Sequence, residues 1–133
     1  MSLSILVVED NKDNMALIDY LLRAHGYAPL LARTGEKGLE VAMRERPDVI
    51  LLDIRLPGID GYQVAARLRR EPTLATTRIV AVTASVMADD RERISSAGLD
   101  GIIPKPIEPE TFIDQLEQFL PDLGARDPGV SQP

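Results

Sequence analysis

The feature that most constrains the fold is an alternation of short, strand-like apolar runs with longer amphipathic segments. Apolar runs occur at residues 4–8, 49–52, 79–82 and 101–103, and a weaker one covers residues 28–32. Strands that are apolar along their length are buried on both faces, which is typical of parallel sheets covered by helices. The sequence therefore predicts an α/β fold with a five-stranded parallel sheet.

The segments between these runs have the apolar period of helices and carry start and stop signals. We expect helices over residues 12–25, 35–46, 61–71, 86–97 and 109–120. Thr34 is expected to cap the second helix, and Asp60 and Gln63 have the spacing of a capping box at the third. Gly26 stands where the first helix would stop, and Pro109 suits the first turn of the last helix.

Size and composition indicate one domain with an aliphatic core. The chain has 133 residues, of which 44% are apolar, and it contains no Trp. This length suits a single domain of ordinary size. From Pro121 onward the residues are mostly polar, with several Pro and Gly. We therefore expect one domain over residues 1–120 and a disordered tail or linker over residues 121–133.

Charge and residue usage disfavour several classes of partner. The formal net charge is −6 and there is no basic run, so we expect no nucleic acid or anionic membrane surface as partner. Arg67, Arg69 and Arg70 are interpreted as a solvated helix face. The absence of Cys excludes disulfides and thiolate metal sites. No apolar run reaches the ~20 residues of a membrane span and the start lacks signal-peptide features, so a cytoplasmic protein is expected.

Polar residues of different chemical kinds follow four of the apolar runs. They are Glu9 and Asp10, then Asp53, then Thr83, and finally Lys105. In open parallel α/β sheets, ligands bind beyond the carboxyl ends of the strands, so we expect these side chains to converge. Carboxylates, a hydroxyl and an ammonium group together suit a magnesium ion and a phosphoryl group.

The acidic residues have the chemistry of a magnesium site. Asp10 and Asp53 are candidate direct ligands, and Glu9 is a candidate for binding through a water molecule. Three carboxylates packed together repel one another unless a cation is present. Alone, each would be better explained as a helix cap or a turn residue, but three at strand ends favour a site. Asp53 is also the best candidate nucleophile, because a carboxylate can hold a phosphoryl group covalently.

The loops after the strands supply the remaining candidate groups. The segment 54–58 contains Pro57-Gly58, which suits a type II turn and could present a backbone carbonyl to the metal. Thr83 offers a hydroxyl and Lys105 a positive charge to the phosphoryl oxygens. Individually they would be explained as a strand residue and a surface lysine. The Lys105-Pro106 bond is a candidate for the cis form.

Four motifs in this order resemble the receiver domain of bacterial two-component response regulators. They are Val-Val-Glu-Asp-Asn, Leu-Leu-Asp-Ile-Arg-Leu-Pro-Gly-Ile-Asp-Gly, Ala-Val-Thr-Ala and Lys-Pro-Ile. The resemblance extends over roughly residues 4–120. Within the family, the chain is similar to DivK-like single-domain regulators and to receivers attached to hybrid kinases. It implies a CheY-like, flavodoxin-type (βα)5 fold, doubly wound, with strand order 2-1-3-4-5.

The resemblance also implies roles for the candidate residues. Asp53 would accept a phosphoryl group from a histidine of a kinase or phosphotransfer protein. Glu9, Asp10 and the Arg55 carbonyl would complete the magnesium pocket, while Thr83 and Lys105 would bind the phosphoryl group and relay the signal. Such a domain is not an enzyme beyond its own phosphorylation and dephosphorylation.

The resemblance further implies a mode of output. The helix 4–strand 5–helix 5 face would contact a downstream protein effector, and the chain would be a monomer or weak dimer. One position departs from the pattern, because Ile102 stands three residues before Lys105, where many receivers carry Tyr or Phe. An aliphatic side chain cannot provide the same ring-burial switch.

Several alternatives have different sequence requirements. The chain could be a receiver excised from a hybrid histidine kinase or a longer regulator. A haloacid dehalogenase-type phosphatase would need a second Asp two residues after the first, where Arg55 stands. A dinucleotide-binding enzyme would need a Gly-rich turn after the first strand, and residues 9–12 do not provide one. A phosphate-independent interaction module would be favoured by a broken Asp-Thr-Lys set, which is intact here.

Overall fold

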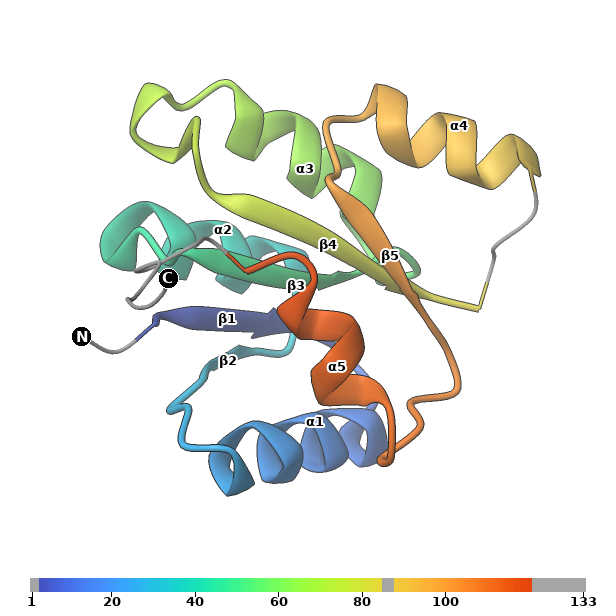
Figure 1. Ribbon diagram of the computed structural model, residues 1–133. Helices are drawn as coiled ribbons and strands as arrows, with labels where there is room; N and C mark the ends of the chain where they lie inside the picture. The colour runs from blue at the N-terminus through green and yellow to red at the C-terminus, as the bar shows by residue number, and fades with distance from the viewer. Residues whose placement is uncertain (1–2, 85–87, 121–133) are drawn as a thin grey trace, which may run out of the picture.

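Five parallel strands form one sheet in the order β2-β1-β3-β4-β5, which confirms the predicted fold class (Figure 1). The computed structural model describes residues 3–84 and 88–120. Its strands are β1 (Ile5–Val8), β2 (Leu30–Ala32), β3 (Val49–Asp53), β4 (Arg78–Thr83) and β5 (Gly101–Pro104). Every strand pair in this sheet is parallel, so all five carboxyl ends lie at the same edge.

Helices cover the sheet on both faces. They are α1 (Lys12–Ala24), α2 (Gly35–Glu45), α3 (Gly61–Arg69), α4 (Ala88–Ser96) and α5 (Phe112–Glu117), with a 3-10 turn η1 (Pro72–Leu74) after α3. One apolar core lies under α1 and α5, and the other lies under α2, α3 and α4 (Figure 1). No helix in residues 3–84 and 88–120 is long and apolar enough to cross a membrane.

The two cores follow from the alternation of side chains along each strand. In β1, Ile5 and Val7 face the α1–α5 core, whereas Leu6 and Val8 face the α2–α3–α4 core. All four side chains of β1 are buried. Each such burial contributes about 1.5–3 kcal/mol relative to exposure, which explains why the strands are apolar throughout.

The structure confirms the predicted helix caps and contains a further cap that was not predicted. Thr34 accepts a hydrogen bond from the Lys37 amide at 3.0 Å, and Asp60 and Gln63 form the reciprocal capping box. The unpredicted cap is Asn11, whose side chain accepts from the Asn14 amide at the start of α1. This cap begins α1 directly after the acidic pair at the end of β1.

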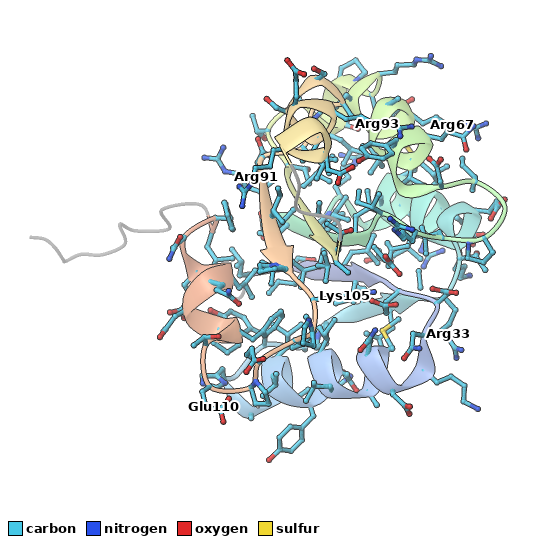
Figure 2. The ribbon with its side chains drawn as sticks, turned by 90° about the vertical axis from the view of Figure 1, so that its right-hand side faces the viewer. Arg33, Arg67, Arg91, Arg93, Lys105 and Glu110 are labelled. Carbon is cyan, nitrogen blue, oxygen red and sulfur yellow. The ribbon has the colours of Figure 1, made fainter. Side chains whose placement is uncertain are left out.

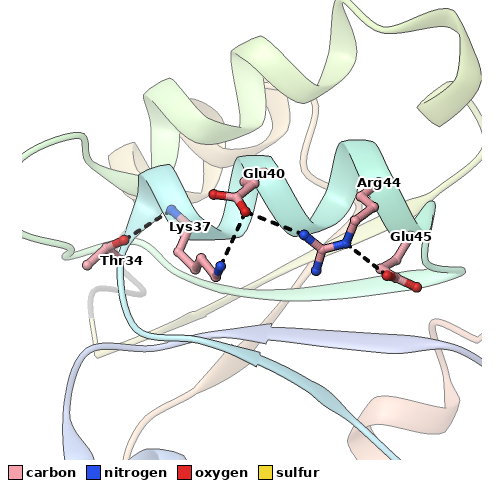
Figure 3. Close-up of polar contacts among 5 residues, drawn as sticks. All are labelled: Thr34, Lys37, Glu40, Arg44 and Glu45. Carbon is pink, nitrogen blue, oxygen red and sulfur yellow. Dashed lines mark hydrogen bonds and ion pairs between the residues drawn. The ribbon is translucent and has the colours of Figure 1, made fainter.

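The exposed side of α2 carries a chain of charged contacts (Figure 3). Glu40 Oε2 lies 3.3 Å from Lys37 Nζ and 3.4 Å from Arg44 Nη1. The Nε atom of Arg44 lies 3.0 Å from Glu45 Oε2. A hydrogen bond to Glu45 is the main cause that raises the pKa of Arg44 above its ordinary value. These pairs are exposed to water, so they shape a solvated helix face and add little to stability.

The chain after α3 contains one element that was not predicted, and one expectation for it needs correction. The segment after residue 71 forms η1 because Leu74 is fully buried and its amide bonds to the Glu71 carbonyl at 2.9 Å. Pro109 lies in a turn that precedes α5 and not in the first turn of the helix, and in this turn the Glu108 carbonyl accepts from the amides of Thr111 and Phe112. The helix therefore begins at Phe112. The expected start of α4 at residues 86–87 lies outside the described residues.

The interpretation of the α3 arginines as a solvated face is wrong for Arg69. Its guanidinium donates to the carbonyls of Gly98, Leu74 and Thr77 and to the carboxylate of Asp100. Long-range acceptors of this kind come together only in the folded chain, so helix periodicity does not reveal them. Arg67 and Arg70 are exposed, as expected.

Candidate functional site

The predicted site residues converge at the carboxyl edge of the sheet. Asp53 is the last residue of β3, and Thr83 is the last residue of the adjacent β4. The Lys105 amide bonds to the Thr83 carbonyl at 2.9 Å, which holds the end of β5 beside β4. Glu9 and Asp10 directly follow β1, the other neighbour of β3. The topology therefore assembles residues up to 96 positions apart, from Glu9 to Lys105.

Three carboxylates form an acidic cluster beside one ammonium group. Oxygen atoms of Glu9, Asp10 and Asp53 all lie within 4.8 Å of one another. The Lys105 Nζ atom lies 3.1 Å from Glu9 Oε1 and 3.3 Å from Asp53 Oδ2. Glu9 and Asp53 are 1% and 3% exposed, so one partly buried cation faces two buried acids. The net charge of this cluster is unfavourable without a further cation.

Backbone amides orient two of the carboxylates. The Asn11 amide donates to Glu9 Oε2 at 3.1 Å, and the Arg55 amide donates to Asp53 Oδ1 at 3.0 Å. These bonds leave Asp53 Oδ2 facing Lys105 and Glu9 Oε1 facing the interior of the cluster. Asn11 thus has two local roles, as helix cap and as donor to Glu9, and neither was assigned to it from the sequence.

Arg33 is a second neighbour of the site that sequence reasoning missed. Its guanidinium donates from Nη2 to the Asp10 carbonyl at 3.3 Å. Arg33 follows the short strand β2, which pairs with β1 and so brings it beside the acidic residues. No local sequence signal identifies this contact, because it depends on the pairing of β2 with β1.

The environment of Glu9 shows that the cluster fits a divalent cation. Burial, followed by hydrogen bonding to Asp53 and repulsion from it, raises the pKa of Glu9 to about 7. The Asn11 amide and Lys105 oppose this rise. Glu9 Oε1 is near the Lys105 charge but has no well-formed hydrogen bond in the described residues. Hard oxygen ligands with an unsatisfied buried oxygen are a donor set that suits Mg²⁺.

Gly58, in the loop after β3, has the positive φ that the predicted turn requires. Gly58 has φ +76, which is the left-handed conformation required at the third position of a type II turn. Gly61 packs so closely that a Cβ there would lie 2.7 Å from the Asp53 carbonyl oxygen. The loop therefore returns to the end of β3 and keeps Arg55 next to the acidic cluster. The Arg55 side chain is exposed.

The remaining predicted residues occupy the places that the sequence indicates. Thr83 is buried at the end of β4, and the Lys105-Pro106 peptide bond is cis. Ile102 is half-buried and packs against the α2–α3–α4 core. Ser85, which stands two residues after Thr83 and was expected near the site entrance, lies outside the described residues.

Comparisons with known proteins identify the family. Residues 5–117 match the sequence model of the response regulator receiver domain. The chain belongs to this family. The receiver is 39% identical to the polar-differentiation response regulator DivK of Brucella anthropi, over 92% of this chain and 99% of DivK. It is 38% identical to DivK of Brucella ovis, with the same coverage.

Solved receiver structures have the same fold. The receiver domain of the sensor histidine kinase PA1611 from Pseudomonas aeruginosa PAO1 has a TM-score of 0.81 and 34% identity, over 90% of this chain and 98% of that one. That structure has a magnesium ion coordinated in its active-site cleft. The Vibrio cholerae chemotaxis protein CheY4 has a TM-score of 0.86 and 25% identity, over 90% of this chain and 100% of that one. This receiver is therefore similar to DivK in sequence and to CheY4 in fold.

Proposed function

We propose that this receiver is a phosphorylation-controlled switch in which Asp53 accepts a phosphoryl group from a phosphohistidine. The observation that carries the proposal is the position of Asp53 Oδ2, which is buried among acids and lies 3.3 Å from Lys105 Nζ. The donor would be a histidine kinase or a histidine phosphotransfer protein. Membership of the receiver family supports this partner class.

The transfer step requires a nucleophilic oxygen and a leaving imidazole. Asp53 Oδ2 forms the new bond to phosphorus as the phosphorus–nitrogen bond of the donor histidine breaks, and the bonding electrons return to the imidazole. The Arg55 amide holds the other carboxylate oxygen at 3.0 Å, which orients Oδ2 toward the donor. Lys105 neutralises charge on the equatorial oxygens during this step.

Magnesium would be held by Asp10, Asp53 and the Arg55 backbone carbonyl, with Glu9 acting through a water molecule. When bound, Mg²⁺ supplies positive charge for the phosphoryl oxygens. The close packing of the three carboxylates supports this ligand set, because their mutual repulsion is relieved by a divalent cation. In this proposal Glu9 gives up its proton before the ion binds.

The signal would pass from Asp53 to a protein effector. The Thr83 hydroxyl would bond to the phosphoryl group, and its movement would change the face formed by α4, β5 and α5. That face contains a groove of about 410 Å³ whose lining includes Ile94, Ile102 and Phe119. Such coupling is typically ~1–3 kcal/mol, enough to alter the affinity of an effector severalfold or more.

A second form of this proposal concerns the parent protein. The receiver of PA1611, a sensor histidine kinase, is 34% identical to this chain. This likeness supports the alternative that the chain is a receiver of a hybrid kinase or longer regulator, with residues 121–133 as its linker. Phosphorylation of Asp53 in the cytoplasm and self-catalysed dephosphorylation are common to both forms.

The test is intact mass spectrometry after incubation with acetyl phosphate, with and without Mg²⁺. We expect one phosphoryl adduct that requires Mg²⁺ and is absent from Asp53→Asn. The matched control is Asp114→Asn, because Asp114 is an exposed residue of α5, outside the acidic cluster. An adduct that persists in Asp53→Asn would contradict the proposed acceptor. No adduct on folded, magnesium-bound protein would contradict the proposed switch.

A further inference from the structure

Helix α4 is attached to the rest of the receiver by few side chains. Among its described side chains, residues 90–96, only Ile94 is buried. A surface helix normally buries an apolar stripe along its whole length, and residues 90–96 of α4 do not form one. Figure 1 shows α4 beside α3 and the end strand β5, at the outer side of the sheet. Its position must therefore depend on contacts other than a continuous apolar face.

Hollows lie on both sides of α4. The groove of about 410 Å³ on the β5 side is lined in part by Arg91, Ile94 and Ser95. On the α3 side, a hollow of about 330 Å³ has Tyr62, Asp90 and Arg93 among its lining residues. Close packing normally restrains an element, and these open surface hollows leave space beside α4 on both sides.

A cation–π contact joins α4 to α3. The guanidinium carbon of Arg93 lies 3.9 Å from the centroid of the Tyr62 ring, within the ~6 Å range of this interaction. Figure 2 shows Arg93 on the side of α4 that faces α3, whereas Arg91 projects elsewhere. Tyr62 is half-buried near the amino end of α3. Arg93 thus reaches from α4 across the hollow to α3.

The carboxyl end of α4 is held differently, by Arg69 of α3. Its Nε atom donates to the Gly98 carbonyl at 2.9 Å, and Nη2 lies 2.9 Å from Asp100 Oδ2. The same Asp100 oxygen accepts from the Ile79 amide of β4 at 2.8 Å. Gly98 has φ +88, and a Cβ there would lie 2.9 Å from Arg69 Cγ. This end of α4 is therefore bound to both α3 and β4.

We propose that α4 is a latched element, with the Arg93–Tyr62 contact as the latch and the Arg69–Gly98 region as a fixed pivot. Opening of the latch frees the helix to move between the two hollows while its carboxyl end stays in place. The amino end of α4 follows Thr83 in the chain after four residues, 84–87. Movement of Thr83 therefore acts on the end of α4 that is opposite the pivot. This coupling to phosphorylation rests on the proposed function, whereas the latch itself does not.

Hydrogen exchange of residues 90–96 in the full chain tests the latch. We expect Tyr62→Leu and Arg93→Gln each to raise exchange in this segment roughly two- to fivefold, with β3 and β4 unchanged. Arg93→Lys keeps a cation over the ring and should retain most of the protection. Arg91→Gln is the matched control, because it removes the same charge from the same helix without touching Tyr62. Exchange that rises equally in Arg91→Gln would show a general charge effect and overturn the latch.

A double variant separates a shared contact from two local effects. Tyr62→Leu with Arg93→Gln should exchange no faster than the faster single variant, because both changes remove one interaction. If the increase in exchange rate in the double variant equals the product of the two single increases, the proposal is overturned. If a single variant unfolds globally, exchange rises in β3 as well. The latch is then tested by whether residues 90–96 exchange more slowly in Arg93→Lys than in Arg93→Gln.

A third arm tests the coupling on wild-type protein with Mg²⁺ and excess acetyl phosphate. Where mass spectrometry shows the Asp53 adduct, exchange of residues 90–96 should rise toward the level of Tyr62→Leu. An adduct without this rise overturns the coupling and leaves the proposed function intact. No adduct overturns the proposed function and the coupling with it, while the latch is decided by the variants alone.

Discussion

Lys105 Nζ lies 3.1 Å from Glu9 Oε1 across the acidic cluster, so one ammonium group balances a carboxylate that is 1% exposed. The same nitrogen faces Asp53 at 3.3 Å. The cation at the end of β5 therefore holds together acids from the ends of β1 and β3 when no metal is bound. This arrangement leads to predictions about charge, pH and packing.

Lys105→Met should destabilise the metal-free protein and increase the stabilisation by Mg²⁺. Removing the cation leaves two buried carboxylates uncompensated, which costs about 1–3 kcal/mol. Urea unfolding with EDTA and with Mg²⁺ measures both effects. Lys37→Met, on the exposed face of α2, should change neither curve much. Equal responses of the two variants would contradict a balancing role for Lys105.

Glu9 should make metal-free stability and magnesium affinity depend on pH in opposite directions. Its pKa is raised from 4.5 to about 7, so its contribution to stability is complete below pH 4.5 and is lost as the pH rises through about 7. Binding of Mg²⁺ requires the ionised form, so affinity should increase over the same range. Urea midpoints and calorimetric titrations between pH 5 and about 8 measure the two trends. Glu9→Gln should flatten both, and unchanged slopes in that variant would assign the titration to another group.

Gly61→Ala should impair the site more than its effect on stability explains. A Cβ there would lie 2.6 Å from Ile54 Cα and 2.7 Å from the Asp53 carbonyl oxygen, so backbone beside the acceptor must shift. We expect a loss of about 1–3 kcal/mol and a slower phosphorylation by acetyl phosphate.

Gly26→Ala is the comparison for this substitution. Gly26 has φ +88 with nothing within 4 Å of the added Cβ, so only backbone strain of about 1–2 kcal/mol is expected. This variant should be phosphorylated at the wild-type rate. Equal phosphorylation rates in the two variants would show that Gly61 has no specific effect on Asp53.

Arg69→Met should be strongly destabilising although arginine is usually a surface residue. The guanidinium donates to the carbonyls of Gly98, Leu74 and Thr77, and these acceptors would lose a charged partner. We expect a loss of about 2–4 kcal/mol in urea unfolding. Arg67→Met removes an exposed charge from the same helix and should stay within about 0.5 kcal/mol of wild type. Similar losses in both variants would rule out the Arg69 contacts as the cause.

Local signals explain why much of the fold could be predicted. The apolar runs indicate strands buried on both faces, and the capping residues Thr34 and Asp60 mark helix starts that the structure confirms. The positive φ of Gly58 is equally local, since it follows from a residue that tolerates this conformation. The expected helix start at Pro109 is wrong, because Pro109 lies in a turn in which the Glu108 carbonyl accepts two amides and the helix begins at Phe112.

For the site, the chemical groups at the strand ends follow from the sequence, because residue type and strand periodicity are properties of the chain. The tertiary structure decided their distances and charges, including the 3.1 Å approach of Lys105 to Glu9 and the raised pKa of Glu9. It also decided the contacts of Arg33, Arg69 and Arg93, whose partners lie on other elements. Burial and long-range neighbours exist only once the strands are paired and the helices are packed, which is why no local pattern encodes them.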